Sequence, residues 1–306
     1  MQKGDRLALA KLLGEGVRSK ASLAPFTAMG VGGPADLVVV VDSVDELTCA
    51  VRAARRCGVP WRVLGCGCNV LVADEGIAGL VIINRAASIS FDGCTVRAES
   101  GAKLAALARR TVDSGLAGMA WAAGLPGTVG GAVVGNAGAF DGDIASKLVS
   151  AVILEPGGRV VERENAWFSF TYRGSRLKHG SAEGGHAATQ HVVLAATFRL
   201  KPDDEATLRA RADEVLAWRR AHHPPGETMG STFKNPPDGY AGELIERAGL
   251  KGHRVGGVMI SEQHANFLVN LGDATAEDVL TLIGLIQVEV ERQFGVELDL
   301  EIEVLG

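Results

Sequence analysis

The chain has few of the features that mark secreted, metal-stapled or membrane-embedded proteins. It holds only five cysteines among 306 residues, all of them before residue 95, and an odd number so distributed argues against a secreted disulfide framework. No histidine precedes His179, and no second cysteine pair follows Cys66 and Cys68 at zinc-finger spacing. The sequence therefore predicts no metal site.

Charge and hydrophobic runs exclude further classes. With 31 basic and 36 acidic residues the net charge is −5, which does not suit a nucleic-acid partner. The first 13 residues lack the continuous apolar run of an export signal, so we expect a cytoplasmic protein. Residues 114–140 carry no charge, but they include eight glycines and Pro126, so we expect no membrane insertion. HExxH and GxSxG motifs are absent, which leaves metalloprotease and α/β-hydrolase readings unsupported.

Glycine, by contrast, is abundant. The chain has 40 glycines, or 13% of its residues, where about 7% is usual. Aromatic residues make up only 5%. Glycine without a collagen-like period is typical of tight turns and of backbone that closely approaches a ligand.

Hydrophobic periodicity predicts an α+β protein. Strand patterns occupy residues 37–41, 61–64, 80–84, 88–98, 149–154, 159–162, 191–200, 257–260, 267–271 and 298–305. Helical spacing is found at residues 45–57, 103–114, 201–223 and 276–294, the last with Thr275 as its expected cap. Because charge density rises sharply at residue 201, we place a domain boundary there.

Two glycine-rich loops resemble phosphate cradles. GCGCN at residues 65–69 follows a predicted strand, and GLPGTVGGA spans residues 124–132. Glycines let successive backbone N–H groups face one concavity, and Asn69 or Thr128 adds a neutral donor. Neither loop fits the P-loop or Rossmann pattern. For either loop alone an ordinary tight turn is the better explanation, whereas the two loops together make a dinucleotide ligand as good an explanation as turns. GVGGP at residues 30–34 follows the same logic more weakly.

A third polar cluster lies in the last hundred residues. GSTFKNP at residues 230–236 combines a hydroxyl, an ammonium group and an amide, as either a ligand-facing loop or a capped turn does. Spacing alone does not single out Arg173, Glu301 or His264, because strand charges usually face solvent.

Taken in order, nine motifs resemble one family. They are VGGPA from residue 31, LGCGCN from 64, the 124–132 loop with NAGA from 136, YRGS from 172, the 230–236 cluster, AGELI from 241, AGLKG from 248, HANF from 264 and LDLE from 298. This pattern resembles the compact branch of the UDP-N-acetylenolpyruvoylglucosamine reductase (MurB) family. The resemblance implies an FAD-binding region over residues 1–200, of two α+β subdomains (about 1–84 and 85–200) in a PCMH-type FAD fold. It also implies a C-terminal α+β substrate-binding domain over residues 201–306.

The resemblance also implies an activity. The enzyme would be a flavin-dependent oxidoreductase, a UDP-N-acetylmuramate dehydrogenase. It would use NADPH and FAD to reduce the enolpyruvyl group of UDP-N-acetylglucosamine enolpyruvate to UDP-N-acetylmuramate. That reaction belongs to peptidoglycan precursor synthesis, and so to cell wall biogenesis, cell shape and cell division. We expect non-covalent FAD, because no histidine precedes residue 179, and a UDP-sugar substrate as the partner. No sequence feature specifies an oligomeric state.

By the same resemblance, Arg173 and Glu301 flank the substrate carboxylate and Ser231 protonates the carbanion. Glu301 helps only if it carries or shares a proton, because two bare carboxylates repel. The predicted substrate contacts are Tyr172, Lys234, Asn235 and His264. The predicted cofactor contacts are Gly65, Gly67, Cys68, Asn69, Gly124, Gly127, Thr128, Gly130, Gly131 and Asn136.

The chain departs from the family at some positions. Cys68 stands where serine is usual, which removes a strong hydroxyl donor but leaves the backbone N–H. Gly30 and Ala120 replace a basic residue and a glutamate, and nothing in the sequence explains either change. Two alternatives remain. One is another flavin oxidoreductase acting on a small hydroxy acid or sugar alcohol, and the other is a nucleotide-binding module without chemistry.

Overall fold

The computed structural model describes residues 3–14, 16–179 and 191–306. The chain forms two compact units, and both are discontinuous in sequence. Unit 1 comprises Met1–Ser19, Asp36–Gly65 and Gly79–Trp218. Unit 2 comprises Lys20–Ala35, Cys66–Ala78 and Arg219–Gly306.

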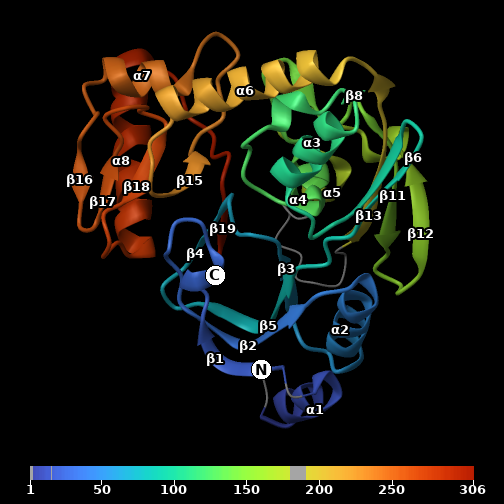
Figure 1. Ribbon diagram of the computed structural model, residues 1–306. Helices are drawn as coiled ribbons and strands as arrows, with labels where there is room; N and C mark the ends of the chain where they lie inside the picture. The colour runs from blue at the N-terminus through green and yellow to red at the C-terminus, as the bar shows by residue number, and fades with distance from the viewer. Residues whose placement is uncertain (1–2, 15, 180–190) are drawn as a thin grey trace. The chain divides into compact units, whose positions relative to one another are not determined.

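The N-terminal half of unit 1 is built on a small sheet (Figure 1). Its strand order is β1-β2-β5-β3, and β3 and β5 run parallel. The elements are α1 (Lys3–Leu13), β1 (Arg18–Ser22), β2 (Pro34–Val41), α2 (Val44–Arg56), β3 (Trp61–Leu64) and β5 (Ile77–Asn84). Ser43 caps α2 by accepting the N–H of Glu46. Leu47, Val51 and Ala54 of α2 share a buried core with β2 and β5, as the helical spacing predicts.

The rest of unit 1 is a five-stranded antiparallel sheet of order β12-β11-β13-β7-β6. Its strands are β6 (Ile89–Asp92), β7 (Thr95–Glu99), β11 (Leu148–Leu154), β12 (Val160–Glu164) and β13 (Val192–Arg199). Helices α3 (Leu104–Asp113) and α4 (Val129–Gly135) pack against this sheet (Figure 1). Their apolar side chains bury Val96, Ala196 and Phe198 of the strands.

Unit 1 also contains several shorter elements, and the long helix α6 (Glu205–His222) begins in it. The short ones are η2 (Ala120–Ala122), η3 (Asn165–Phe168), α5 (Arg176–His179), β8 (Leu116–Ala117), β9 (Gly138–Ala139), β10 (Gly142–Asp143) and β14 (Lys201–Pro202).

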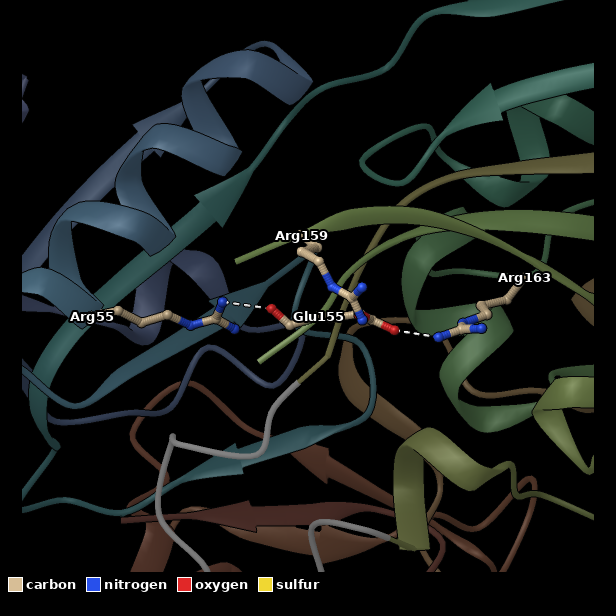
Figure 2. A network of polar contacts seen from close by, with 4 residues as sticks. All are labelled: Arg55, Glu155, Arg159 and Arg163. Carbon is tan, nitrogen blue, oxygen red and sulfur yellow. Dashed lines mark hydrogen bonds and ion pairs between the residues drawn. The ribbon is translucent and has the colours of Figure 1, made fainter. Parts of the chain in front are cut away.

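One buried residue, Glu155, contacts both halves of unit 1 (Figure 2). Glu155, at the end of β11, accepts hydrogen bonds from Arg159 (2.9 Å) and from Arg163 of β12. Its backbone carbonyl accepts one from Arg55 of α2 at 2.7 Å. The hydrogen bond from Arg163 and the neighbouring positive charge of Arg159 hold the pKa of Glu155 below its ordinary value. The ionised carboxylate therefore holds the β11–β12 hairpin together, and the Arg55 bond to the backbone carbonyl anchors α2 to it.

Unit 2 is a second α+β body. An antiparallel sheet of order β15-β18-β17-β16 is accompanied by the long helix α8. The elements are η1 (Ala24–Phe26), β4 (Val70–Val72), β15 (Glu227–Ser231), α7 (Ala241–Arg247), β16 (Arg254–Val255), β17 (Val258–Ile260), β18 (Phe267–Asn270), α8 (Ala276–Phe294) and β19 (Glu303–Leu305). Met29, Val31 and Leu71, from the two early segments, complete its core.

The structure confirms the α+β class and most of the predicted elements. α8 begins at the predicted cap, where Thr275 and Asp278 form a reciprocal capping box. Two predictions are wrong in detail. Residues 129–135 form helix α4 rather than an extended glycine loop, and the closing strand is restricted to Glu303–Leu305. Within the described ranges, no helix is long and apolar enough to cross a membrane.

Candidate functional site

In unit 1, two predicted cofactor residues meet where β3 ends and α4 begins. A Cβ on Gly65 would lie 2.3 Å from Thr128 Oγ1, so only glycine lets the backbone approach this closely. Thr128 is the N-cap of α4, and its hydroxyl accepts the N–H of Gly131. Gly127 has a φ of +130°, and open space lies where its Cβ would be. Gly65, Gly127 and Thr128 therefore form a surface at the start of α4 where little side chain covers the backbone.

The backbone donors at this surface differ from the simple cradle that the sequence predicts. The N–H groups of Val129 and Gly130 already donate to the carbonyls of Ala102 and Ser100, both at 2.8 Å. The N–H of Gly131 donates to the Thr128 hydroxyl. Among the described residues, the N–H groups of Gly127 and Thr128 have no acceptor. The donors available to a phosphate therefore lie just before α4 rather than in its first turn.

Asn136, at the other end of α4, positions Arg173. Asn136 has a left-handed backbone (φ +43°), its side-chain N–H donates to the carbonyl of Thr171 at 3.0 Å, and its side-chain oxygen accepts the N–H of Ala145. Thr171 and Gly174 pair with each other and close a tight turn. Asn136 therefore supports the turn that carries the predicted catalytic arginine.

Arg173 itself has a φ of +54°, a conformation that costs a non-glycine residue about 1 kcal/mol or more. Its Nη1 donates to the carbonyl of Gly138 at 2.7 Å, and its guanidinium lies 5.4 Å from the ring centroid of Tyr172. The Tyr172 side chain is 60% exposed. The strained backbone, the bond to Gly138 and the contact with Tyr172 fix the direction of the guanidinium fork.

The predicted cofactor residue Gly124 follows η2 and has a left-handed backbone, with a φ of +70°.

In unit 2, the other glycine loop is attached to the C-terminal segment. Gly67 has a φ of +58°, its carbonyl accepts the N–H of Ala28, and a Cβ on it would lie 2.2 Å from the carbonyl oxygen of Phe26. The Asn69 side chain donates to the backbone carbonyl of Glu301 at 3.0 Å. The predicted cofactor donor Asn69 therefore also holds the chain that carries Glu301.

Two of the predicted catalytic residues lie on paired segments. The N–H of Glu301 donates to the carbonyl of Thr232 at 2.9 Å, and the N–H of Lys234 donates to the carbonyl of Asp299 at 2.8 Å. Phe233 and Leu300 form the antiparallel bridge between these bonds. Because Ser231 immediately precedes Thr232, the structure brings the Ser231 and Glu301 backbones together within unit 2. Arg173 belongs to unit 1.

A residue that sequence reasoning missed fixes this pairing. Asn266 is 4% exposed, its side-chain amide donates to the carbonyl of Phe233 (2.8 Å), and its side-chain oxygen accepts the Phe233 N–H (2.9 Å). Its own carbonyl accepts the N–H of Thr232 at 2.8 Å. The HANF motif contained this asparagine. Its amide bonds the N–H and the carbonyl of Phe233 as a neighbouring strand would, and no sequence spacing predicts such a contact.

The predicted substrate residues of unit 2 have structural partners as well. Lys234 Nζ lies 3.5 Å from a carboxylate oxygen of Asp299, and the side-chain oxygen of Asn235 accepts the N–H of Ala241. His264 accepts the N–H of Asn266 at Nδ1, so its Nε2 carries the proton when the ring is neutral. Burial is the main reason that the pKa of His264 lies below its usual value. His264 is therefore a neutral Nε2–H donor at pH 7.

Other features of the described residues do not mark a second active site. Among the residues that the structure places, no group of three or more histidine, cysteine, aspartate or glutamate side chains could hold a metal ion. A cavity of about 440 Å³ in unit 1 is lined by Lys147, Arg199 and Lys201 among others. None of the predicted site residues lines this cavity. Its residue Arg199 is the last residue of β13, which begins at Val192.

The chain is similar to proteins of one known family. Residues 222–305 match the profile of the UDP-N-acetylenolpyruvoylglucosamine reductase C-terminal domain, and residues 35–163 match that of an FAD-binding domain. UDP-N-acetylenolpyruvoylglucosamine reductase 2 of Symbiobacterium thermophilum is 43% identical over 95% of this chain and 92% of its own length. The reductase of Moorella thermoacetica is 41% identical over 99% of both chains.

A solved structure is also similar to this chain. The crystal structure of UDP-N-acetylenolpyruvylglucosamine reductase from Thermus caldophilus matches with a TM-score of 0.79 and 35% sequence identity. The match covers 95% of this chain and all of that one. Similarity therefore extends over both units.

Proposed function

Because the chain belongs to the UDP-N-acetylenolpyruvoylglucosamine reductase family, we propose that it uses NADPH to reduce UDP-N-acetylglucosamine enolpyruvate through non-covalently bound FAD. It is an FAD-dependent oxidoreductase of peptidoglycan synthesis, and its product is UDP-N-acetylmuramate. The observation that carries the residue assignment is the pairing of residues 232–234 with 299–301, which joins the Ser231 and Glu301 segments.

The residues of both glycine loops fit FAD. Gly65 has no room for a side chain, and Gly127 borders open space where a ligand can approach the backbone. The N–H groups of Gly127 and Thr128 suit a diphosphate without a charged side chain. Gly67, Cys68 and Asn69 are the proposed donors from the other loop. A bound FAD would supply the chemistry that carries hydride from the nicotinamide to the enolpyruvyl double bond.

Arg173 is proposed to bind the enolpyruvyl carboxylate. Its guanidinium offers a fixed fork of donors, and the bond to Gly138 together with the turn that Asn136 supports limits its motion. Negative charge develops on the carbon next to that carboxylate during reduction. A preorganised donor at such a position is worth about 3 kcal/mol in the barrier.

Ser231 and Glu301 are proposed to complete the chemistry. The Ser231 hydroxyl transfers its proton to the substrate carbon that does not receive hydride, so hydride and proton together saturate the double bond. Glu301, in its protonated form, is proposed to donate a hydrogen bond to the same substrate carboxylate as Arg173. The two backbone bonds on either side of Phe233 support this proposal, because they hold together the backbone segments that carry these side chains.

The remaining polar residues of this site are proposed to bind the UDP-sugar. Lys234, Asn235 and His264 lie in unit 2, and Tyr172 lies beside Arg173 in unit 1. Neutral His264 donates from Nε2, and Asn235 keeps its side-chain N–H groups for a ligand because its oxygen is occupied. We further propose a functional division at about residue 200, a cytoplasmic location and, through the product, roles in cell shape and division.

The test is the visible spectrum of the purified protein under anaerobic conditions. We expect NADPH to bleach the flavin, and UDP-N-acetylglucosamine enolpyruvate to restore its colour rapidly. Denaturation should release the yellow colour from the chain. Bleaching without recovery would contradict the substrate assignment, and a protein that binds no FAD would contradict the whole proposal.

A further inference from the structure

Two thiols face each other inside the glycine loop of unit 2. Cys68 Sγ lies 3.3 Å from Cys66 Sγ and 3.4 Å from the Cys66 carbonyl oxygen. Both side chains are half-buried, and both cysteines are reduced in this structure. A left-handed Gly67, with φ +58°, stands between them and bends the chain so that the two sulfur atoms approach.

The loop is held from behind at Gly67. The Gly67 carbonyl accepts the N–H of Ala28 at 3.0 Å, and the Phe26 carbonyl oxygen occupies the place of a Gly67 Cβ. Gly67 is therefore held in place, and the sulfurs come closer by rotation of the two cysteine side chains and of the peptide groups that join them to Gly67. A disulfide has an S–S length of about 2.05 Å, so the bond requires an approach of roughly 1.3 Å.

We propose that Cys66 and Cys68 form a dithiol–disulfide site that reacts with low-molecular-weight disulfides. One thiol loses its proton, and its thiolate attacks the disulfide to give a mixed disulfide and one released thiol. The second protein thiolate then displaces the second small thiol and closes the Cys66–Cys68 bond. Two protein thiols are oxidised by two electrons, one small disulfide is reduced to two thiols, and the two protons pass to those thiols.

The bond has a consequence for the cofactor, and this step rests on the proposed function of the loop. The backbone N–H groups of residues 67–69 are the proposed donors to FAD from unit 2. Closing the disulfide turns the peptide groups on both sides of the fixed Gly67. We expect the oxidised loop to lose one charge-assisted hydrogen bond to the diphosphate, which raises the FAD dissociation constant about tenfold.

The chain offers a direct test by peptide mass. Trypsin releases residues 63–85 as one peptide, because Arg62 and Arg85 are the nearest cleavage sites. The cysteines of that peptide are Cys66 and Cys68 alone. The folded apoprotein is equilibrated with glutathione disulfide, treated with iodoacetamide and digested. We expect this peptide to lose about 2 Da and take up no label, and dithiothreitol to restore two labelled thiols.

Three variants separate the proposal from general thiol oxidation. Cys66→Ser and Cys68→Ser should each abolish the loss of mass, whereas Cys94→Ser, in another tryptic peptide, should retain it. Two labelled thiols after glutathione disulfide, or a stable glutathione adduct on this peptide, would overturn the dithiol site.

FAD affinity is measured on the same samples by quenching of flavin fluorescence. A dissociation constant about tenfold higher in the oxidised wild type than in the reduced form is expected. Equal affinities would overturn the coupling to the cofactor. Disulfide formation in a protein that binds FAD in neither state would instead refute the proposed cofactor role of the loop, and the dithiol site would stand.

Discussion

The side-chain amide of Asn69 donates a 3.0 Å hydrogen bond to the backbone carbonyl of Glu301. The carbonyl of Asn69 in turn accepts the N–H of Glu303 at 2.9 Å. A residue of the proposed cofactor loop thereby fixes the segment that carries a proposed catalytic carboxyl. Binding of the cofactor loop and placement of Glu301 are thus linked within unit 2.

The first prediction concerns this link. Asn69→Ala should slow reoxidation of the reduced flavin by substrate about fivefold, because the Glu301 segment loses a bond worth about 1 kcal/mol. The FAD dissociation constant should change less than the reoxidation rate. Rapid-mixing absorbance at the flavin band measures the rate. Glu303→Ala is the matched control, since its backbone bond to Asn69 survives, and it should leave the rate unchanged. A loss confined to FAD affinity would show that Asn69 contacts only the cofactor.

The second prediction concerns the buried amide of Asn266. Asn266→Leu strands the N–H and carbonyl of Phe233 in the core, so the free energy of unfolding should fall by about 2–4 kcal/mol. Urea unfolding followed by circular dichroism measures it. Asn270→Ala, at the end of the same strand β18, removes the hydrogen bonds of a residue that is only half-buried and should cost less. Equal losses in the two variants would contradict a special role for Asn266.

The third prediction uses Thr232, the neighbour of Ser231. Its side chain is 1% exposed, and among the described residues its hydroxyl has no hydrogen-bond partner. Replacing the hydroxyl with a methyl group removes a buried polar atom, so Thr232→Val should stabilise the protein by about 1 kcal/mol. Its backbone bonds to Asn266 and Glu301 do not change. A lower urea midpoint would reveal an acceptor for this hydroxyl.

The fourth prediction is a pH dependence. Burial, followed by the positive charge of Arg219 and those of His264 and His222 when they are protonated, lowers the pKa of His223 to about 4 from a usual value of 6.5. Between these values the unfolded chain binds a proton that the folded chain does not, so stability falls as the pH drops from about 6.5 to 4. The full shift corresponds to about 3 kcal/mol, but a half-exposed ring is screened by solvent, and we expect about 1 kcal/mol.

Urea midpoints at about pH 7.5 and pH 5 test this dependence. His223→Gln should have the smaller difference between the two midpoints, because glutamine does not titrate. His253, which stands before β16, provides the control: His253→Gln should keep the wild-type difference. An unchanged difference in His223→Gln would contradict the lowered pKa.

The fifth prediction tests the guanidinium fork. Arg173→Lys keeps the charge but loses the planar donor pair, so kcat/KM should fall about 10²-fold. Arg176→Lys, an exposed change in the same segment, should have no such effect. Steady-state oxidation of NADPH with the enolpyruvyl substrate measures both. Full activity in Arg173→Lys would show that a point charge is sufficient.

The sequence predicted what local patterns determine. α8 has a clean apolar face and a threonine cap, and α2 has regular spacing, so both were located within a residue or two. Pattern reasoning failed at residues 129–135, because glycine-rich sequence has low intrinsic helix propensity. Thr128 and the carbonyls of Ala102 and Ser100 satisfy the first-turn amides and compensate for it.

Longer-range features were beyond the sequence patterns. The core of unit 2 takes Met29 and Leu71 from segments that precede it by some 150 residues or more, and no periodicity marks such contacts. Asn136, Asn69 and Asn266 all hold backbone groups distant in sequence. Their motifs were noticed through a family resemblance, whereas their roles as supports follow only from the hydrogen bonds.

The most direct test of the account is the single-turnover rate at which substrate reoxidises the reduced flavin of Ser231→Ala. If Ser231 supplies the proton, this rate should fall by about 10²–10⁴, while reduction by NADPH proceeds at the wild-type rate. Ser231→Cys, which retains an acidic hydrogen at the same place, should recover part of the loss. A Ser231→Ala enzyme that reoxidises at the wild-type rate would contradict the assignment of the proton donor.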